Sequence, residues 1–158
     1  MLFLETERLI LRYFQPEDVR RLYEYRSKPE VERFQSWKNY QLEDARQAVS
    51  YYQNRFFYGQ GGTFQLAICL KSGEMIGDVF FDQSEAGCFI GYTLDSSYWK
   101  QGYAYEVMSH LLGCLHDDYH IRFFRAVILP ENQASIRLIR KLGFFQHSRH
   151  EYFLYWLA

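Results

Sequence analysis

The sequence has few of the features that mark secreted, membrane or nucleic-acid-binding proteins. Its 158 residues include only three cysteines, which lie far apart among apolar neighbours. This number and spacing match neither a disulfide framework nor a cysteine-based metal site, and they favour buried thiols in a reducing compartment. The formal net charge is −1, so charge gives no general argument for binding to nucleic acid or to a membrane surface.

No hydrophobic run has the length of a membrane span. The amino terminus, Met1 to Glu5, also lacks the basic start and the sustained apolar run of a signal peptide. We therefore expect a soluble, cytoplasmic protein that uses no metal and binds neither membrane nor nucleic acid. The chain has no internal repeat, low-complexity tract or linker, and its length suits one domain over residues 1–158.

Aromatic side chains, by contrast, are abundant: the chain has 14 Tyr, 14 Phe and 3 Trp. Such rings are expected to fill much of the core or to line a cleft. Charge is unevenly distributed, because residues 74–106 carry six acidic residues and one basic residue, whereas residues 121–150 carry six basic residues and one acidic residue. Two interpretations stay open, namely solvated faces that neutralise each other or an anion-binding half beside a cation-binding half.

The hydrophobic pattern predicts a strand-rich centre flanked by helices. Alternation in Arg8 to Tyr13 predicts a first strand. Pro16 and the two acids after it begin a helix that should bury its apolar residues, Val19, Leu22 and Tyr23. A second helix is predicted from Leu42 to Phe57 by apolar residues at helical spacing. Three short strands in an antiparallel meander should follow, over residues 63–70, 75–81 and 88–94.

The second half of the chain predicts a crossover unit. A helix begins at Gly102, and the next strand, Phe123 to Leu129, should lie parallel to the strand before the helix. Asn132 caps a further helix that ends at Gly143, and the chain finishes in a strand pair over residues 144–147 and 152–157. The fold class expected is therefore α/β (α+β), with a mixed, mostly antiparallel, twisted sheet flanked by helices.

The junction between the third meander strand and its helix has the composition of an anion-binding site. Tyr92-Thr93-Leu94 ends the strand, and Gly102 begins the helix after a short turn. The first amide N–H groups of a helix have no partner inside it, and the helix dipole adds partial positive charge there. Gly102 and Ala104 leave room for a diphosphate to approach the backbone. The alternative is a turn glycine before an ordinary helix.

Three motifs then appear in a fixed order, Trp99 to Ala104, Pro130 to Ser135 and Lys141 to Phe144. With the strands and helices between them, they make the chain resemble the GNAT acetyltransferases over nearly its whole length. The opening Glu5 to Arg12 and the pair Gly91-Tyr92 are similar to the branch that includes the RimJ and RimL ribosomal-protein N-terminal acetyltransferases.

The resemblance implies acetyl-coenzyme A as acetyl donor and a primary amine as acceptor, either a protein amino terminus or a small-molecule amine. It implies a β-bulge or V-shaped split between two parallel central strands, whose unpaired backbone can bond the pantetheine arm. The residues implied to bind the cofactor lie at the end of the first strand, at the start of its helix and on the following helix: Tyr92, Thr93, Leu94, Lys100, Gln101, Gly102, Tyr103, Ala104, Tyr105, Asn132 and Ser135.

The catalytic groups are less clearly marked. Many relatives place a tyrosine general acid where this chain has Ile139. Ser135 is a candidate to protonate the leaving sulfur, with Tyr98 as a substitute. Asp78 and Asp82 share one face of a strand and are candidates for the general base, although ordinary strand-edge acids have the same pattern.

The resemblance places the acceptor near Phe34 and Trp37, which can equally be core residues, with Asp82 as an acidic group of that pocket. The missing tyrosine motivates an alternative function, a coenzyme-A-binding domain with little or no turnover. A plain α/β interaction module is a third hypothesis. The aromatic segment Tyr152 to Trp156 is either a dimer interface or a core strand, so both a monomer and a homodimer stay open.

Overall fold

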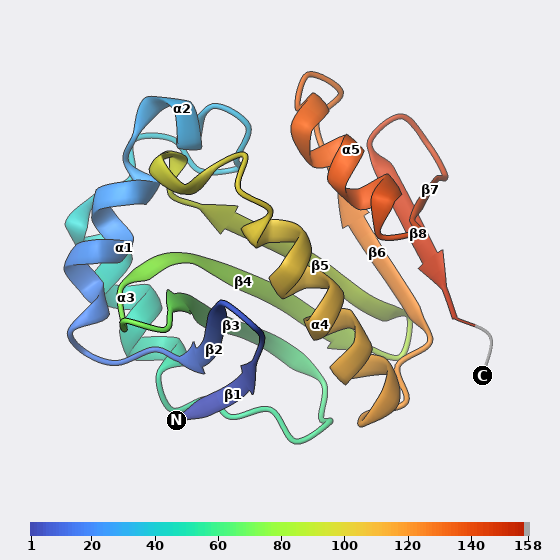
Figure 1. Cartoon of the computed structure of the whole chain (residues 1–158), viewed down its shortest axis with the longest axis horizontal. Helices are drawn as coiled ribbons and strands as arrows, with labels where there is room; N and C mark the ends of the chain where they lie inside the picture. Colours follow the sequence, from blue (N-terminus) through green and yellow to red (C-terminus); the bar gives the residue numbers. More distant parts are fainter. Residues whose placement is uncertain (157–158) are drawn as a thin grey trace.

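The structure, a computed structural model, describes residues 1–156 of the chain. It contains one eight-stranded sheet in the order β1-β2-β3-β4-β5-β6-β8-β7 (Figure 1). All neighbouring strands are antiparallel except β5 and β6, which are parallel. The strands are β1 (Leu2–Glu5), β2 (Leu9–Tyr13), β3 (Gly62–Leu70), β4 (Met75–Ser84), β5 (Gly87–Leu94), β6 (Phe123–Val127), β7 (Phe145–Gln146) and β8 (Glu151–Tyr155).

Helices flank this sheet on both sides. In Figure 1, α4 crosses in front of the central strands, α5 lies beside β6, and α1 and α3 lie away from α5, where they pack against the other face of β3 and β4. The helices are α1 (Asp18–Arg26), α2 (Pro29–Glu32), α3 (Leu42–Tyr52), α4 (Tyr103–Asp117) and α5 (Gln133–Lys141), and a 3₁₀ turn covers Ser96–Tyr98. None of the helices in residues 1–156 is long and apolar enough to cross a membrane.

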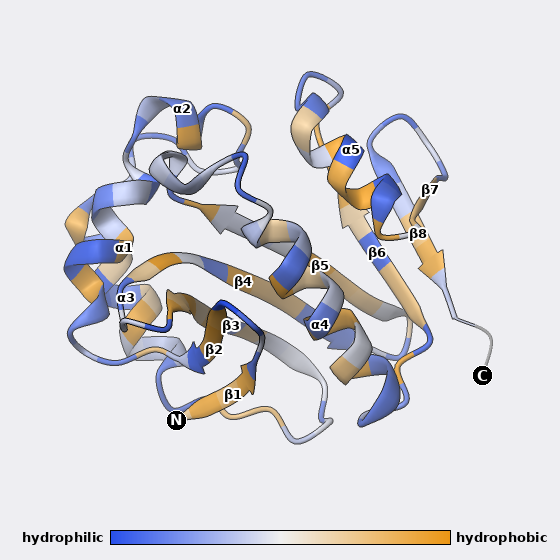
Figure 2. Cartoon of the chain, viewed as in Figure 1, coloured by the Kyte–Doolittle hydropathy of each residue, from blue (hydrophilic) through white to orange (hydrophobic). Residues whose placement is uncertain are grey.

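Alternating side chains of β3 separate two hydrophobic clusters. Leu66 and Ile68 belong to the larger cluster, which includes the buried residues of α4 and α5, whereas Ala67 and Cys69 pack with α1 and α3. Because successive side chains of a strand point to opposite faces, the centre of the sheet is buried on both sides. Figure 2 shows hydrophobic residues concentrated along the strands and hydrophilic residues in the loop between β7 and β8.

The main elements predicted from the sequence are confirmed. Strands β3, β4 and β5 form the antiparallel meander, and β6 lies parallel to β5. Helix α4 begins directly after Gly102, and α5 begins after Asn132, whose side chain accepts a hydrogen bond from the Ser135 amide. The mixed, mostly antiparallel sheet therefore has the expected form.

Several details of the prediction are wrong. Helix α3 ends at Tyr52 rather than Phe57, because Phe57 turns into the core and donates its amide to the Tyr13 hydroxyl at 2.9 Å. Helix α1 packs Tyr23 only partly buried against its cluster and fully buries Tyr25, which was not among the expected residues and whose hydroxyl donates to the buried Asp78 carboxylate. Strand β1 was not expected, and it extends the sheet by pairing with β2.

The carboxyl-terminal strands are shorter than predicted. Strand β6 ends at Val127, where its pairing with β8 stops, rather than at Leu129. Strand β7 covers only two residues, and β8 ends at Tyr155. The predicted end of that strand, Leu157, lies outside the described residues.

The feature of the fold that positions the site is the divergence of β5 from β6. The two strands pair only at Cys88 with Phe124 and at Phe89 with Arg125. The V-shaped split is therefore present, and Figure 1 shows β5 and β6 separating toward α5. It forms without a bulge in β5, because the register of β5 with β4 is continuous over the whole strand.

Candidate functional site

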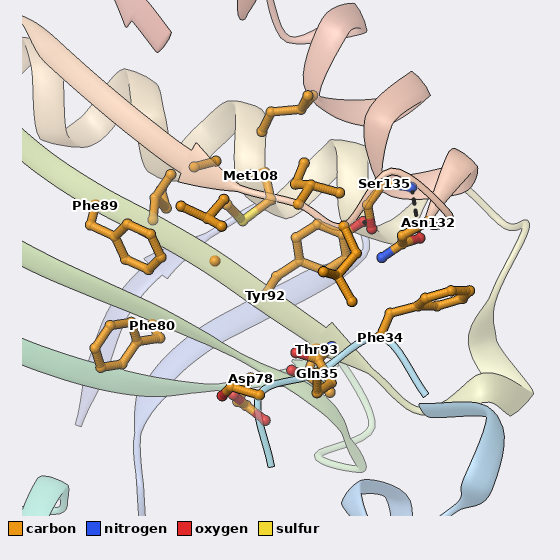
Figure 3. Close-up of a pocket in the computed structure, with 18 of the residues that line it drawn as sticks. Phe34, Gln35, Asp78, Phe80, Phe89, Tyr92, Thr93, Met108, Asn132 and Ser135 are labelled. Carbon is orange, nitrogen blue, oxygen red and sulfur yellow. Dashed lines mark hydrogen bonds between the residues drawn. The ribbon is translucent and has the colours of Figure 1, made fainter. Parts of the chain in front are cut away.

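The split between β5 and β6 contains a cleft of about 570 Å³. It reaches from the aromatic pair of Phe80 and Phe89 at one end to Asn132 and Ser135 at the start of α5, with Tyr92 between them (Figure 3). The lining also includes Arg26 from α1, Met108 from α4, and four residues of the loop that follows α2, namely Phe34, Gln35, Ser36 and Trp37. Over the whole lining, most side chains are apolar, which suits an organic ligand rather than a bare ion.

The amino terminus of α4 lies beyond the end of β5. Gly102 has a φ of 82°, in the left-handed region that glycine adopts without strain. Six consecutive amide groups, from Lys100 to Tyr105, donate to no acceptor in residues 1–156, because the first helical bond runs from the Glu106 amide to the Gly102 carbonyl. Free amides at a helix amino terminus form an anion-binding site.

An ion-pair network from the first loop supports this turn. The Glu106 carboxylate accepts hydrogen bonds from the Thr6 hydroxyl at 2.5 Å, from the Arg8 amide at 2.9 Å and from Arg8 Nε at 2.7 Å. Arg8 also donates to the Gln101 carbonyl at 2.9 Å, and its guanidinium lies 4.3 Å from the centre of the Tyr103 ring. Although burial opposes the charge, these hydrogen bonds lower the pKa of Glu106.

Two hydroxyl groups meet inside the cleft. The Tyr92 and Ser135 side-chain oxygens lie 3.0 Å apart, and the Ser135 amide donates to Asn132 Oδ1 at 3.3 Å, which fixes the start of α5 (Figure 3). Burial raises the pKa of Tyr92, while the hydrogen bond with Ser135 opposes that shift. Tyr92 therefore holds its proton at neutral pH and can share it with Ser135.

The floor of the cleft holds a buried ion pair. Arg26 donates to Asp78 from Nη2 at 2.6 Å and from Nε at 3.1 Å, and Gln65 donates to the same carboxylate at 3.0 Å. The Tyr25 hydroxyl is a further donor, and burial raises the pKa of Tyr25 well above its ordinary value. The Asp78 side chain is 1% exposed and the Arg26 side chain 11%. Both oxygens of Asp78 are thus already occupied.

The two aromatic residues expected near the acceptor do line the cleft. Phe34 follows α2 and lies opposite β5, while the Arg26 guanidinium lies 4.0 Å from the centre of the Trp37 ring. Trp37 also donates its indole N–H to the Arg26 carbonyl at 3.1 Å and packs against the α1 and α3 cluster. For Trp37, the cleft and core positions predicted as alternatives therefore coexist.

Other sequence candidates lie outside the cleft. Tyr98 donates its hydroxyl to Glu74 at 2.7 Å and does not contribute to the lining. Leu94 is buried, and its carbonyl accepts a hydrogen bond from the Trp99 indole at 3.0 Å. The Tyr105 ring of α4 lies 4.2 Å from the Lys141 ammonium group of α5. Asp82 lines a second hollow beside the cleft.

Sequence reasoning missed three polar residues whose partners lie far away in the chain. Arg8 lies in the loop before β2, Arg26 in α1 and Gln65 in β3, where nothing in the neighbouring sequence distinguishes them from surface residues. The one available signal for Arg8 was its position in the segment similar to the RimJ and RimL branch. Arg26 gave none, because its partner Asp78 lies 52 positions away in the chain.

A family model for the acetyltransferase (GNAT) domain matches residues 8–145. Among curated relatives, the uncharacterised N-acetyltransferase p20 of Bacillus licheniformis is 31% identical over 145 residues, which cover 89% of this chain and 81% of the relative. The uncharacterised N-acetyltransferase YoaA of Bacillus subtilis is 31% identical over 146 residues, which cover 89% of this chain and 81% of that relative.

Solved structures share the fold. A GNAT-family acetyltransferase from Bacillus anthracis superposes with a TM-score of 0.84 at 23% identity, over 99% of this chain and 98% of that chain. RimL, a ribosomal L7/L12 α-N-protein acetyltransferase in complex with coenzyme A, superposes with a TM-score of 0.81 at 22% identity, over 98% of this chain and 96% of that chain. These matches and the family model confirm the resemblance read from the motifs, and the chain belongs to the GNAT acetyltransferase family.

Proposed function

We propose that this acetyltransferase moves the acetyl group of acetyl-coenzyme A to the nitrogen of a primary amine by direct attack in a ternary complex. The observation that carries the proposal is the run of six free amides from Lys100 to Tyr105, just beyond the open edge of β5. The amides suit a diphosphate, and the unpaired edge at Tyr92 and Thr93 suits the peptide-like pantetheine arm. RimL, of the same fold, is described in complex with coenzyme A.

The residues around the turn fit such a ligand. Gly102 and Ala104 present little side-chain bulk, so an anion can reach the amides directly. Arg8 adds positive charge at the same place, because a Cβ atom on Gly102 would stand 3.3 Å from Arg8 Nη2. Asn132 lines the cleft, and its amide N–H₂ group makes no hydrogen bond within the described residues, so it is available to a carbonyl of the ligand.

The Tyr92–Ser135 pair supplies the proton that the leaving sulfur needs. The neutral amine nitrogen attacks the thioester carbon, the new C–N bond forms, and the C–S bond breaks to leave a thiolate. The thiolate takes the Ser135 hydroxyl proton, and Ser135 is reprotonated from Tyr92 across their 3.0 Å contact. Tyr92 recovers its proton from water, while the amine releases one proton to water. The proton count is therefore balanced.

We assign Asp78 a positioning role rather than the role of general base. A base must accept the amine proton, whereas the Asp78 oxygens already accept hydrogen bonds from Tyr25, Arg26 and Gln65. Protonation would also leave the buried Arg26 without its counter-ion, which is costly. Asp78 instead fixes Arg26, and Arg26 in turn lies against Trp37 in the wall of the acceptor end.

The alternative function is a coenzyme-A-binding domain with little or no turnover. It is favoured by Ile139, which lines the cleft with 3% of its surface exposed at the position where many relatives have a tyrosine acid. The Tyr92–Ser135 contact argues against this alternative, because it brings a phenol into the same cleft from β5.

Two measurements test the proposal. Acetyl-coenzyme A at a hundred times its Kd should stabilise the fold by about 2.7 kcal/mol, which raises Tm by roughly 5 to 10 °C. Release of free thiol from acetyl-coenzyme A should then depend on added amine, with a panel of diamines, amino acids and peptide amino termini as acceptors. A Tm increase without thiol release for every acceptor would favour the binding domain, and no Tm increase would contradict both functions.

A further inference from the structure

A second hollow adjoins the end of the cleft that Phe80 and Phe89 line. It has a volume of about 310 Å³ and is lined by Phe80, Asp82, Ser84, Ala86, Gly87, Phe89 and Arg125. Phe80 and Phe89 also line the main cleft, where their ring centres lie 6.3 Å apart. This Asp82–Arg125 hollow is therefore a side chamber of the cleft, separated from it by one aromatic pair.

The sheet register places two opposite charges in this chamber. Asp82 is the cross-strand partner of Phe89, and Phe89 is the cross-strand partner of Arg125. Cross-strand partners present their side chains on the same face of the sheet. Asp82 and Arg125 thus stand on either side of the Phe89 ring, and the Arg125 guanidinium lies 6.0 Å from the centre of that ring.

Neither charge is well satisfied by the protein. The Asp82 carboxylate has no hydrogen bond or ion pair within residues 1–156. The Arg125 side chain is 42% exposed, but its Nε atom is buried and has no partner within residues 1–156, and the guanidinium makes one long contact, 3.4 Å from Nη2 to Glu151. Buried polar atoms in native proteins nearly always have partners, so an unpaired one at a hollow indicates a ligand group.

The pattern of charge selects the class of ligand. A carboxylate and a guanidinium separated by one phenyl ring complement a zwitterion, whose ammonium group pairs with Asp82 and whose carboxylate pairs with Arg125. A ligand that carried only one of these charges would leave the other protein group unpaired. The head of a free α-amino acid has both charges on one carbon atom.

The reacting amine must be a different group from the one at Asp82. An ammonium ion held by a carboxylate keeps its proton, whereas attack on the thioester needs a neutral nitrogen. Tyr92 lies three residues beyond Phe89 on β5, about 10 Å along the strand, and its side chain points to the other face of the sheet, so the second amine has to reach into the split between β5 and β6. A flexible alkyl stem such as that of lysine can span that distance in large part. Phe80 and Phe89 would lie against that stem.

We propose that the Asp82–Arg125 hollow binds the zwitterionic head of a free diamino acid and directs its side-chain amine into the cleft as the acetyl acceptor. The acceptor role of that amine rests on the proposed acetyltransferase function, whereas binding of the head group does not. The proposal excludes simple diamines and peptide amino termini as preferred ligands, because neither presents an ammonium and a carboxylate on the same carbon.

The test uses three ligands that differ by one charge each: L-lysine, cadaverine, which lacks the carboxylate, and 6-aminohexanoate, which lacks the α-ammonium group. Calorimetry in the presence of coenzyme A measures binding, and thiol release from acetyl-coenzyme A measures turnover. We expect L-lysine to bind at least tenfold more tightly than either analogue. Asp82→Asn and Arg125→Gln should each weaken L-lysine about tenfold or more, and each should affect least the analogue that lacks the group it pairs with.

Glu85→Gln and Arg122→Gln are matched controls, because both residues are exposed, lie near the hollow in the chain and do not line it. Equal binding of the three ligands, or equal losses for all three in either variant, would overturn the proposal. If lysine binds as expected and no amine gives thiol release, the proposed function fails while the binding site stands. If other amines give release and lysine does not bind, the binding site fails while the function stands.

Discussion

The hydroxyl oxygens of Tyr92 and Ser135 lie 3.0 Å apart in the cleft between β5 and β6. Tyr92 comes from the strand and Ser135 from the first turn of α5, which Asn132 fixes through the Ser135 amide. This contact brings a phenol toward the place where many relatives have a tyrosine and this chain has Ile139. Proton delivery to the leaving sulfur is therefore assigned to two residues on two elements.

Tyr92→Phe and Ser135→Ala should each lower kcat about 100-fold, at the low end of general acid catalysis, because a thiolate is already a good leaving group. The KM for acetyl-coenzyme A should change little, and the double variant should lose hardly more than Ser135→Ala alone, since the two hydroxyls act in series. Steady-state thiol release measures all three variants.

Tyr155→Phe is the control, because it removes a hydroxyl from an exposed residue of β8. Tyr98→Phe distinguishes between Ser135 and Tyr98, the two general acids predicted from the sequence. It should leave kcat nearly unchanged, since the Tyr98 hydroxyl donates to Glu74 outside the cleft. A fall in kcat for Tyr98→Phe as large as for Ser135→Ala would contradict the assignment. So would losses in the Tyr92 and Ser135 variants that appear only in KM.

Arg8→Ala should raise the KM for acetyl-coenzyme A about tenfold, equal to about 1.4 kcal/mol, with a smaller effect on kcat. The reason is that Arg8 both supports the turn through Gln101 and Glu106 and adds charge near the free amides. Lys71→Ala is the matched control, because it removes an exposed ion pair with Glu5 on the same part of the sheet. An unchanged KM in Arg8→Ala would show that the turn needs no support from this loop.

Arg26→Met should lower the free energy of unfolding by about 3 to 5 kcal/mol, because it leaves the Asp78 carboxylate buried without a cation. Urea denaturation followed by circular dichroism measures the loss. Arg46→Met breaks an exposed pair with Glu43 and should cost less than about 1 kcal/mol. The double variant Arg26→Met with Asp78→Asn should recover part of the loss. If Arg26→Met alone cost no more than Arg46→Met, Asp78 would be solvated and the account of the buried pair would be wrong.

Stability should fall in acid partly through Asp95. Although burial favours its neutral form, hydrogen bonds from Lys28 at 2.5 Å and from Arg21 lower the pKa of Asp95 in the folded protein. A lowered folded pKa means that the unfolded state binds the proton more readily. The contribution is thus present above the ordinary carboxyl pKa of about 3.9 and is lost as pH falls through the folded value.

Asp95→Asn tests this linkage. It should cost about 2 kcal/mol at pH 7, and the difference from the parent protein should shrink in denaturant titrations below about pH 4. Glu85→Gln is the control, because that exposed carboxylate makes no hydrogen bond in the described part of the chain. A difference that stays constant from pH 7 to pH 3 would remove Asp95 from the acid response.

The fold was largely predictable because its signals are local. Hairpin-length turns fix the meander, and Gly102 and Asn132 mark two helix starts. The V-shaped split was expected from the family resemblance. The free amides of α4 follow from those same few residues. Errors occurred where a distant contact overrides local pattern, as for Phe57, which leaves the predicted helix to pack in the core.

The chemistry of the cleft was less predictable, because its pairs join distant parts of the chain. Tyr92 and Ser135 are 43 positions apart, and Arg8 and Glu106 are 98 positions apart. Ser135 was identified through the family motif, whereas the hydroxyl of Tyr92 was not, since the resemblance points to its backbone. Asp82 and Arg125 come to flank Phe89 only when β4, β5 and β6 align in register.

Initial rates of thiol release at varied concentrations of both substrates test the central claim most directly, because direct attack requires acetyl-coenzyme A and amine in the cleft together. The account predicts double-reciprocal plots that intersect, and no thiol release without amine. Parallel plots would indicate an acetylated enzyme intermediate, and thiol release that is independent of amine would indicate hydrolysis. Either result would contradict direct transfer between the two ligands.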